Sequence, residues 1–229
     1  IGIVITLQFI SGTVLQKTLQ RRRIRWLSAL FGKYVSPEVA AELMNSDVEG
    51  ALAGDNREVT LLFADLRDFT ALSERLGPMK TRALLNRFFE VVIPVVFKNK
   101  GTLDKLMGDA VMAIFGVPKL HEDDPVRAIR AAGEIHEIVD RMGLELEKKI
   151  GQTFCMHSGI NTGLVVTGEI NFEKGTHGVA GDTVNVAARL SMLGRAGEIV
   201  VSRDTYLQSE GYFDFEDIGH SKIKGKDQP

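Results

Sequence analysis

Two short apolar runs, each followed by an aspartate, constrain the fold and the function of this chain more than any other feature. Residues 59–64 have the pattern of a buried strand, and Asp65 follows them. A second pair of strand-like runs flanks Gly108-Asp109, which is a dipeptide typical of a two-residue hairpin turn. A strand end beside a hairpin tip can bring two carboxylates together, and such a pair needs a compensating cation. The sequence therefore predicts a divalent-metal site that serves phosphate chemistry.

The composition is that of a globular protein and narrows the choice of partners. Of the 229 residues, 44% are hydrophobic and 25% are charged, and the formal net charge is −2. This charge gives no electrostatic case for binding nucleic acid. The single cysteine, Cys155, excludes an internal disulfide and indicates a reducing compartment. Because Cys155 lies in an apolar run, we predict that it belongs to the core.

The N-terminal segment differs from the rest of the chain. Residues 1–16 carry no charge, and a basic cluster between Lys17 and Arg25 follows them. This order fits the positive-inside arrangement, whereas a signal peptide carries its charges first. We predict that residues 1–20 are the C-terminal part of a transmembrane helix, with an amphipathic or buried soluble helix as the alternative. Since the chain starts at Ile1, we expect it to be part of a longer protein.

The remaining sequence divides into a connector, residues 21–57, and a main domain, residues 58–229. In the connector, Ser36-Pro37 predicts the start of a short helix. The first half of the main domain is predicted to contain a strand ending at Asp65, a helix over 79–99 with a kink or break at Pro94, and the hairpin. The second half is predicted to contain a helix over 123–148, then a strand, a turn and a second strand over 153–168, and a helix over 183–193. Short strands are predicted near 198–202 and 212–219. Strands and helices that interleave around a tight hairpin favour an α+β fold with a mixed or antiparallel sheet.

A third informative segment, GVAGDTVNVAARL, covers residues 178–190. Asp182 is the predicted N-cap of its helix. Asn185 and Arg189 are four residues apart and therefore share one face of that helix. An amide and a guanidinium on one face suit an anionic, oxygen-rich ligand, although alone such a pair is more often solvated surface.

Together, the segments FADLRDFT, LDKLMGDAVMAIFG and GVAGDTVNVAARL closely resemble the class III nucleotide cyclases, in particular the adenylyl cyclase domains of membrane-attached bacterial members. FGKYVSPEV, residues 31–39, resembles the short transducing element that precedes the catalytic domain in those proteins. Diguanylate cyclases carry GG(D/E)EF at their hairpin, whereas this hairpin reads MGDAV. The resemblance implies a ferredoxin-like βαββαβ-type catalytic domain that works as a head-to-tail homodimer.

The resemblance also implies a role for individual residues. Asp65 and Asp109 correspond to the metal-binding aspartates, and the Leu66 carbonyl adds a ligand for two ions, Mg²⁺ or Mn²⁺. The backbone of the next residues is expected to cradle the phosphates; these residues are Leu66, Arg67, Asp68, Phe69 and Thr70. Asn185 resembles the residue that orients the ribose, and Arg189 the arginine that stabilises charge on the α-phosphate. Lys224 matches a phosphate-binding lysine, with Lys226 as the alternative.

Two positions bear on the choice of base. Lys105 matches the lysine that accepts adenine, where guanylyl cyclases carry an acidic residue. Its usual partner, Asp or Thr, is replaced by Gly178, which has no side chain, although Thr176 or His177 could substitute. Another departure is Asp68, where the family commonly has glycine.

We therefore expect an adenylyl cyclase that converts ATP to 3′,5′-cyclic AMP and pyrophosphate by two-metal, in-line attack of the ribose 3′-hydroxyl on the α-phosphate. The alternatives are a guanylyl or relaxed-specificity cyclase, and a degenerate cyclase domain that only regulates. The expected location is the cell inner membrane, with the catalytic domain in the cytoplasm. None of the five histidines is assigned a role in catalysis, and surface or core positions are expected for them.

Overall fold

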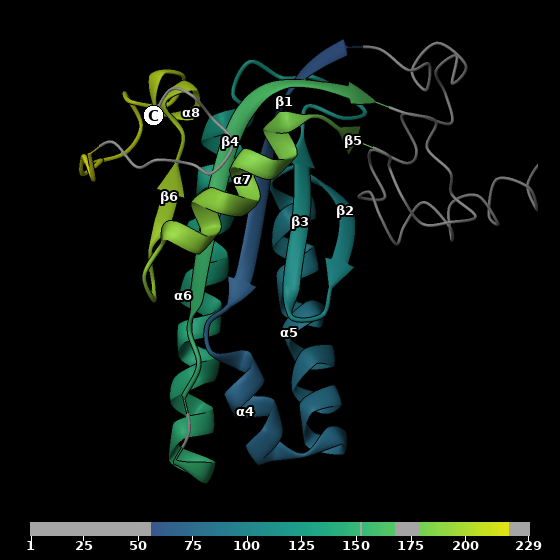
Figure 1. Ribbon diagram of the computed structural model, residues 1–229, viewed down its shortest axis with the longest axis vertical. Coiled ribbons are helices and arrows are strands. Elements are labelled where there is room, and N and C mark those ends of the chain that lie inside the picture. The colour runs from purple at the N-terminus through teal and green to yellow at the C-terminus, as the bar shows by residue number, and fades with distance from the viewer. Residues whose placement is uncertain (1–55, 152, 168–178, 220–229) are drawn as a thin grey trace, which may run out of the picture.

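The computed structural model describes residues 56–151, 153–167 and 179–219. In these residues one sheet lies between helices on its two faces (Figure 1). The strands are β1 (Asn56–Leu66), β2 (Thr102–Met107), β3 (Ala110–Phe115), β4 (Met156–Thr167), β5 (Val179–Ala180) and β6 (Ile199–Val201). The helices are α4 (Phe69–Leu76), α5 (Pro78–Lys98), α6 (Asp124–Ile150), α7 (Asp182–Leu193) and α8 (Arg203–Leu207).

The sheet has the strand order β2-β3-β1-β4-β5, and its pairings along this path are antiparallel. β6 pairs with β4 in parallel, so the sheet as a whole is mixed. The order β2-β3-β1-β4, with helices between β1 and β2 and between β3 and β4, is that of a ferredoxin-like βαββαβ unit. The predicted α+β class and the mixed sheet are therefore confirmed.

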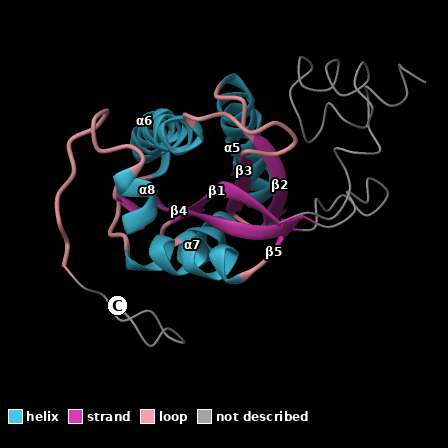
Figure 2. Ribbon diagram, turned by 90° about the horizontal axis from the view of Figure 1, so that it is seen from above, coloured by secondary structure: helices cyan, strands magenta, loops and turns pink. Residues whose placement is uncertain are grey.

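The two faces of the sheet are covered differently. Figure 2 shows α5 and α6 on one face and α7 on the other. Side chains alternate along β1, so Leu62 and Ala64 enter the large core that includes residues of α5 and α6, while Val59 and Leu61 share a second core with Ala187 of α7. By the same alternation, Asp65 lies on the α7 face of the sheet.

The prediction of a strand, a turn and a second strand over 153–168 is wrong, because β4 runs without interruption and pairs with the whole length of β1. Helix α7 packs against the residues that suggested a turn. Asn161 donates from Nδ2 to the Thr183 carbonyl at 2.9 Å, and Gly163 leaves room for the Thr183 side chain. Turn-forming residues in this strand therefore serve helix packing.

Of the predicted kink or break of the helix at Pro94, the break is wrong, because α5 is continuous through this residue. The helix continues to Lys98, and Pro94 lies on its exposed side. A proline has no amide hydrogen, so one backbone carbonyl in the preceding turn has no intrahelical donor. On the exposed side this carbonyl can bond to water, which lowers the free-energy cost of a proline inside the helix.

The predicted strand near 212–219 is also wrong. The described residues there form turns and irregular structure. Phe213 and Phe215 pack against the main core, and Phe215 contacts the ring of Tyr206 edge-on with a centroid distance of 5.2 Å. The apolar residues that suggested a strand are thus used in packing without strand pairing.

Two local predictions need correction. Asp182 is the first residue of α7, and Gly181 occupies the N-cap without a side-chain hydrogen bond. Cys155 is half-buried and precedes β4, where its carbonyl accepts a hydrogen bond from the Arg67 amide at 2.8 Å, so it is not a core residue.

Across the described ranges, none of the helices combines the length and the apolar character that crossing a membrane requires. The predicted transmembrane segment at 1–20, most of the predicted connector, Gly178 and Lys224 all lie outside the described residues.

Candidate active site

The two aspartates that the sequence singled out lie next to each other at one end of the sheet. Asp65 is the penultimate residue of β1, and its register partner on β3 is Ala110. Asp109 immediately precedes Ala110 at the tip of the β2–β3 hairpin. The first central residue of the turn, Gly108, has a φ of 68°, which glycine adopts without strain. The hairpin thus sets Asp109 beside the end of β1.

Partial burial raises the free-energy cost of ionising both carboxylates. Desolvation raises the pKa of Asp65, and the nearby His157 opposes this shift. Desolvation also raises the pKa of Asp109, and the charge of Asp65 raises it further. Among the described residues, Asp65 Oδ1 is buried and accepts no hydrogen bond. Two adjacent carboxylates, one with an unsatisfied oxygen, fit the donor set of a hard divalent cation.

These carboxylates do not form a complete metal cage. Within the described residues, no three side chains of His, Cys, Asp or Glu are gathered closely enough to hold a metal ion. A bound ion would need further oxygen ligands, such as the Leu66 carbonyl and the oxygens of a phosphate-bearing substrate, as is usual for Mg²⁺ sites.

The loop between β1 and α4 contains the residues expected to cradle phosphates. Leu66 and Phe69 are buried in the main core, and Phe69 begins α4, whose first backbone amides have no intrahelical partner. Asp68 between them is exposed and left-handed, with a φ of 57°, which explains why glycine would suit this position. Thr70 is exposed in the first turn of α4.

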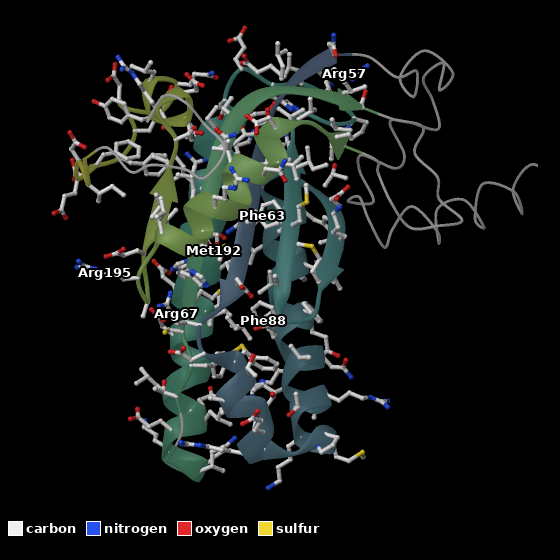
Figure 3. All side chains as sticks on the ribbon, in the orientation of Figure 1. Arg57, Phe63, Arg67, Phe88, Met192 and Arg195 are labelled. Carbon is white, nitrogen blue, oxygen red and sulfur yellow. The ribbon has the colours of Figure 1, made fainter. Side chains whose placement is uncertain are left out.

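The side chain of Arg67 connects this loop to the end of α7. Its Nη1 donates to the Gly194 carbonyl at 3.3 Å. In Figure 3, Arg67 lies near Met192, at the C-terminal end of α7. The side chain of Arg67 therefore has a structural contact of its own, besides the predicted role of its backbone.

Helix α7 presents Asn185 and Arg189 away from the sheet. Asn185 is exposed and Arg189 is half-buried, whereas Val186, Ala187 and Leu190 are buried. The helix lies directly on β4, because a Cβ at Gly159 would collide with backbone atoms of Ala187 and Ser191. The aspartates and the Asn185–Arg189 pair thus lie on separate elements of one chain.

Lys105 is half-exposed on β2, and its Nζ lies 3.3 Å from Oδ2 of Asp104. Asp104 is only 2% exposed, and its Oδ1 has no hydrogen-bond partner among the described residues. The register of β2 against β3 shifts between Leu103 and Lys105. Sequence reasoning did not identify Asp104, although a carboxylate inside a strand-like run was a usable signal.

His157 is a second residue that sequence reasoning missed. It is the register partner of Asp65 on β4, and its Nε2 lies 3.8 Å from Asp65 Oδ2. Its Nδ1 lies 2.6 Å from the Ser191 carbonyl oxygen of α7. The pattern of residues 153–168 predicts two short strands, so it does not indicate the pairing of Asp65 with His157.

Similarity searches connect this geometry to known proteins. Among curated proteins, the chain is 29% identical to adenylate cyclase 1 of Rhizobium meliloti over 199 residues, which are 86% of this chain and 30% of that protein. It is 33% identical to an uncharacterized protein of Mycobacterium tuberculosis over 219 residues, which are 92% of this chain and 37% of that protein. The chain thus spans about a third of the length of these relatives.

Solved structures of similar fold include cyclases for both purines. The adenylyl cyclase CyaB from P. aeruginosa superposes with a TM-score of 0.74 at 30% identity, covering 78% of this chain and 93% of that one. The guanylyl cyclase Cya2 superposes with a TM-score of 0.66 at 33% identity, covering 76% and 88%. The family model described as "Adenylate and Guanylate cyclase catalytic domain" matches residues 53–229. With the paired aspartates at the sheet end, these matches establish that the chain belongs to the class III nucleotide cyclases.

Proposed function

We propose that this chain is an adenylyl cyclase that converts ATP to 3′,5′-cyclic AMP and pyrophosphate. The observation that carries the proposal is the pair of half-buried, mutually repelling carboxylates, Asp65 and Asp109, on the same sheet as Lys105. The carboxylate pair supplies the site for divalent cations, and the lysine supplies a donor for adenine N1.

In this proposal the bound Mg²⁺ or Mn²⁺ ions would activate the ribose 3′-hydroxyl and offset charge on the phosphates. Asp65, Asp109 and the Leu66 carbonyl would hold these ions. The backbone amides of residues 66–70 bind the phosphates, Asn185 orients the ribose, and Arg189 stabilises charge on the α-phosphate. Lys224 is proposed to bind phosphate as well. No covalent enzyme intermediate is required.

The active site is proposed to be shared between two copies of the chain. One copy supplies the aspartates and Lys105, and the other supplies Asn185 and Arg189 from α7. The separation of these sets on different elements, with Asn185 exposed, supports this arrangement. A head-to-tail homodimer would then contain two equivalent sites, and a monomer would be inactive.

A mixing experiment tests the shared site. Asp65→Ala and Arg189→Ala are each expected to abolish turnover almost completely. A mixture of the two inactive variants should regain activity, because one composite site in the mixed dimer keeps all its residues. If mixed dimers form, as measured by pull-down of differently tagged chains, and remain inactive, the shared-site proposal fails.

A guanylyl or relaxed-specificity cyclase is the second candidate. It is favoured by the similarity to Cya2 and by Gly178, which offers no side chain to accept from the adenine amino group. Lys105 opposes it, since a carboxylate at that position would accept from guanine. The pairing of Lys105 with the buried Asp104 supports a fixed position of the lysine within β2.

Product formation from ATP and from GTP, each with Mg²⁺ and with Mn²⁺, separates these candidates. Cyclic AMP alone supports the adenylyl assignment, and Lys105→Glu should then shift product toward cyclic GMP. Comparable amounts of cyclic GMP from the unmodified chain would support relaxed specificity. No product from either nucleotide would favour a degenerate, regulatory cyclase domain.

We also propose that the catalytic domain, residues 58–229, is attached to the cell inner membrane and faces the cytoplasm. The uncharged segment at 1–16 and the basic cluster that follows support a transmembrane helix ending near residue 20. Residues 21–57 would then connect this helix to the catalytic domain. Fractionation of the full-length protein, with protease accessibility of the catalytic domain from each side, tests this topology.

A further inference from the structure

We infer that the buried carboxylate of Asp104 positions Lys105 for the purine base, and that it thereby strengthens the preference of the site for ATP over GTP. This role of Asp104 rests on the proposed function, in which Lys105 contacts the base. It follows from an irregularity in β2, from a contact between neighbouring side chains, and from the burial of Asp104.

An extra residue in β2 determines the face of the sheet on which Lys105 lies. Leu103 belongs to the large core on the side of α5 and α6. Lys105 pairs with Met112 of β3, which belongs to the second core on the side of α7, and directly paired residues share a face. In a regular strand, residues 103 and 105 would lie on one face. The shift at Asp104 therefore moves Lys105 to the α7 face, where Asp65 also lies.

The extra residue is Asp104 itself. Leu103 and Lys105 have register partners on β3, whereas Asp104 has none. β2 is also the first strand in the order β2-β3-β1-β4-β5, so it lies at an edge of the described sheet (Figure 1). Bulges are frequent at sheet edges and beside active sites, where they redirect a side chain. The irregularity thus places a carboxylate next to the lysine that it redirects.

Asp104 and Lys105 contact each other through their side chains. Nζ of Lys105 lies 3.3 Å from Oδ2 of Asp104, although consecutive residues of a regular strand point to opposite faces. A lysine without such a contact would sample many rotamers of its four-carbon stem. The ammonium has three donors, so one can bond to Oδ2 while the others stay available to a base. The carboxylate therefore restricts the ammonium without saturating it.

The burial of Asp104 distinguishes this contact from a surface ion pair. The Asp104 side chain is 2% exposed, whereas that of Lys105 is 40% exposed. Exposed ion pairs restrict their side chains weakly, but a buried carboxylate depends strongly on a neighbouring cation. Among the described residues, Lys105 is the cation that contacts Asp104, and Oδ1 has no hydrogen-bond partner. Asp104 therefore anchors the ammonium from the buried side and leaves the other side open to a ligand.

A lysine that is held in this way can discriminate between the purines. Its donors suit N1 of adenine, which accepts a hydrogen bond, and they oppose N1–H of guanine, which donates one. A lysine that could turn away would avoid this conflict, and guanine would then be tolerated. A fixed donor therefore favours ATP and disfavours GTP. Because Gly178 has no side chain to bind the adenine amino group, Lys105 should carry a larger share of this discrimination.

Binding of 3′-deoxy-ATP and of 3′-deoxy-GTP to the 229-residue chain with Mg²⁺, measured by calorimetry, tests this role, because neither analogue can cyclise. Asp104→Asn is the main variant, since asparagine has the shape of aspartate without its charge. Asp104→Leu is the second variant if Asp104→Asn does not fold, because an apolar residue suits a buried position. Asp124→Asn is the matched control, since Asp124 is a buried carboxylate paired with Arg127 at the start of α6.

Asp104→Asn should weaken binding of 3′-deoxy-ATP about fivefold, without weakening binding of 3′-deoxy-GTP, so the ratio of the two dissociation constants changes. In cyclisation assays the KM for ATP should rise while kcat changes little. Asp124→Asn should leave the ratio unchanged. In a Lys105→Met background, Asp104→Asn should alter the ratio less than about twofold, because the carboxylate acts through the lysine.

An unchanged ratio in folded Asp104→Asn, or an equal change in the Lys105→Met background, would overturn the role of Asp104 and leave the proposed function intact. A selective loss of 3′-deoxy-GTP binding would also overturn it, since the carboxylate would then bind guanine itself. If the unmodified chain binds neither analogue and makes no cyclic nucleotide, the proposed function fails, and the role of Asp104 fails with it.

Discussion

The ladder between β1 and β4 contains two pairs of polar residues that differ in how their hydrogen-bonding groups are satisfied. In the first pair, the Thr60 and Thr162 hydroxyls lie 2.9 Å apart, and Thr162 continues to Thr205 of α8 at 2.9 Å. In the second pair, Asp65 and His157 do not form a direct hydrogen bond, and Asp65 Oδ1 has no partner within the described part of the chain.

The threonine pair is typical of polar groups that stabilise the fold, whereas the pair of Asp65 and His157 is typical of polar groups that bind a ligand. Thr60 and Thr162 are 1% and 3% exposed, and their hydroxyls find partners inside the protein, so they link α8 to the sheet. The carboxylate of Asp65 loses water on folding and does not regain all of its hydrogen bonds inside the protein, so its ionised form lowers the stability of the fold unless a cation is bound.

Asp65→Asn should lower cyclase activity by at least about a hundredfold, because it removes a charge that holds the metal ions. It should also abolish the rise in melting temperature that we expect Mn²⁺ to give the unmodified chain. Initial rates and thermal melts with and without Mn²⁺ measure both effects. Residual activity near the unmodified level would show that Asp65 is not a metal ligand.

The same variant should be more stable than the unmodified chain when both are in EDTA. The folded-state pKa of Asp65 is raised, so its contribution to stability is present below the unfolded pKa and is lost as the pH rises through the folded pKa. The gain in melting temperature from Asp65→Asn should therefore be larger at pH 7 than at pH 4. A loss of stability at pH 7 would mean that the ionised carboxylate has partners inside the fold.

Thr162→Val should lower the free energy of unfolding by about 1–3 kcal/mol, since it leaves the Thr60 and Thr205 hydroxyls with fewer partners. Urea unfolding measures this change. Thr162→Ser keeps the hydroxyl and should recover most of the stability. The activity per folded molecule should not change, and a selective loss of activity in Thr162→Val would place this pair in the active site.

His136 is expected to make the fold sensitive to acid. It is 6% exposed, its Nε2 lies 2.8 Å from the Ser158 hydroxyl, and burial lowers its pKa. The unfolded chain then takes up a proton more readily than the folded one, so stability is lost as the pH falls below about 6.5.

His136→Gln tests this expectation, because the amide can still bond to the Ser158 hydroxyl but does not titrate. Chemical unfolding at pH 7 and at pH 5 should show a smaller loss for this variant than for the unmodified chain. Equal losses in both proteins would assign the acid sensitivity to other groups.

Asp68→Gly should have the smallest effect on stability, less than about 1 kcal/mol, because relief of the left-handed backbone is offset by the greater freedom of glycine in the unfolded chain. It should also lower the KM for the nucleoside triphosphate, since it removes a negative charge beside the phosphate loop. Asp68→Asn removes the charge and tolerates the same backbone, so it should match the KM effect. If only the glycine variant lowers KM, the cause is conformational.

The sequence predicted the strand end and the hairpin tip that carry Asp65 and Asp109 for a physical reason, while the metal-binding role of the two aspartates stays a prediction. A buried run followed by Asp65 and a two-residue turn at Gly108-Asp109 are local signals, and local signals specify a strand end and a hairpin tip. The helices α5, α6 and α7 were also predicted to within a few residues, since each has an apolar face.

The errors occurred where distant residues determine the outcome. Asn161 and Gly163 are turn formers in isolation, but α7 packs on them, so β4 stays continuous. His157 received no role because its relation to Asp65 depends on the register between two strands about 90 residues apart, which no local pattern contains. The roles of Asn185, Arg189, Lys105, Gly178 and Lys224 remain predictions.

The direct contact of α7 with β4 at Gly159 has a consequence for evolution as well as for regulation. The backbones approach so closely there that any side chain at position 159 would push α7 off the sheet, and this close packing favours one orientation of Asn185 and Arg189 relative to Asp65 within each chain. In the proposed homodimer, an upstream signal would then act by rotating one subunit against the other. Any input domain that delivers such a rotation could drive the same catalytic chain, whatever stimulus that domain detects.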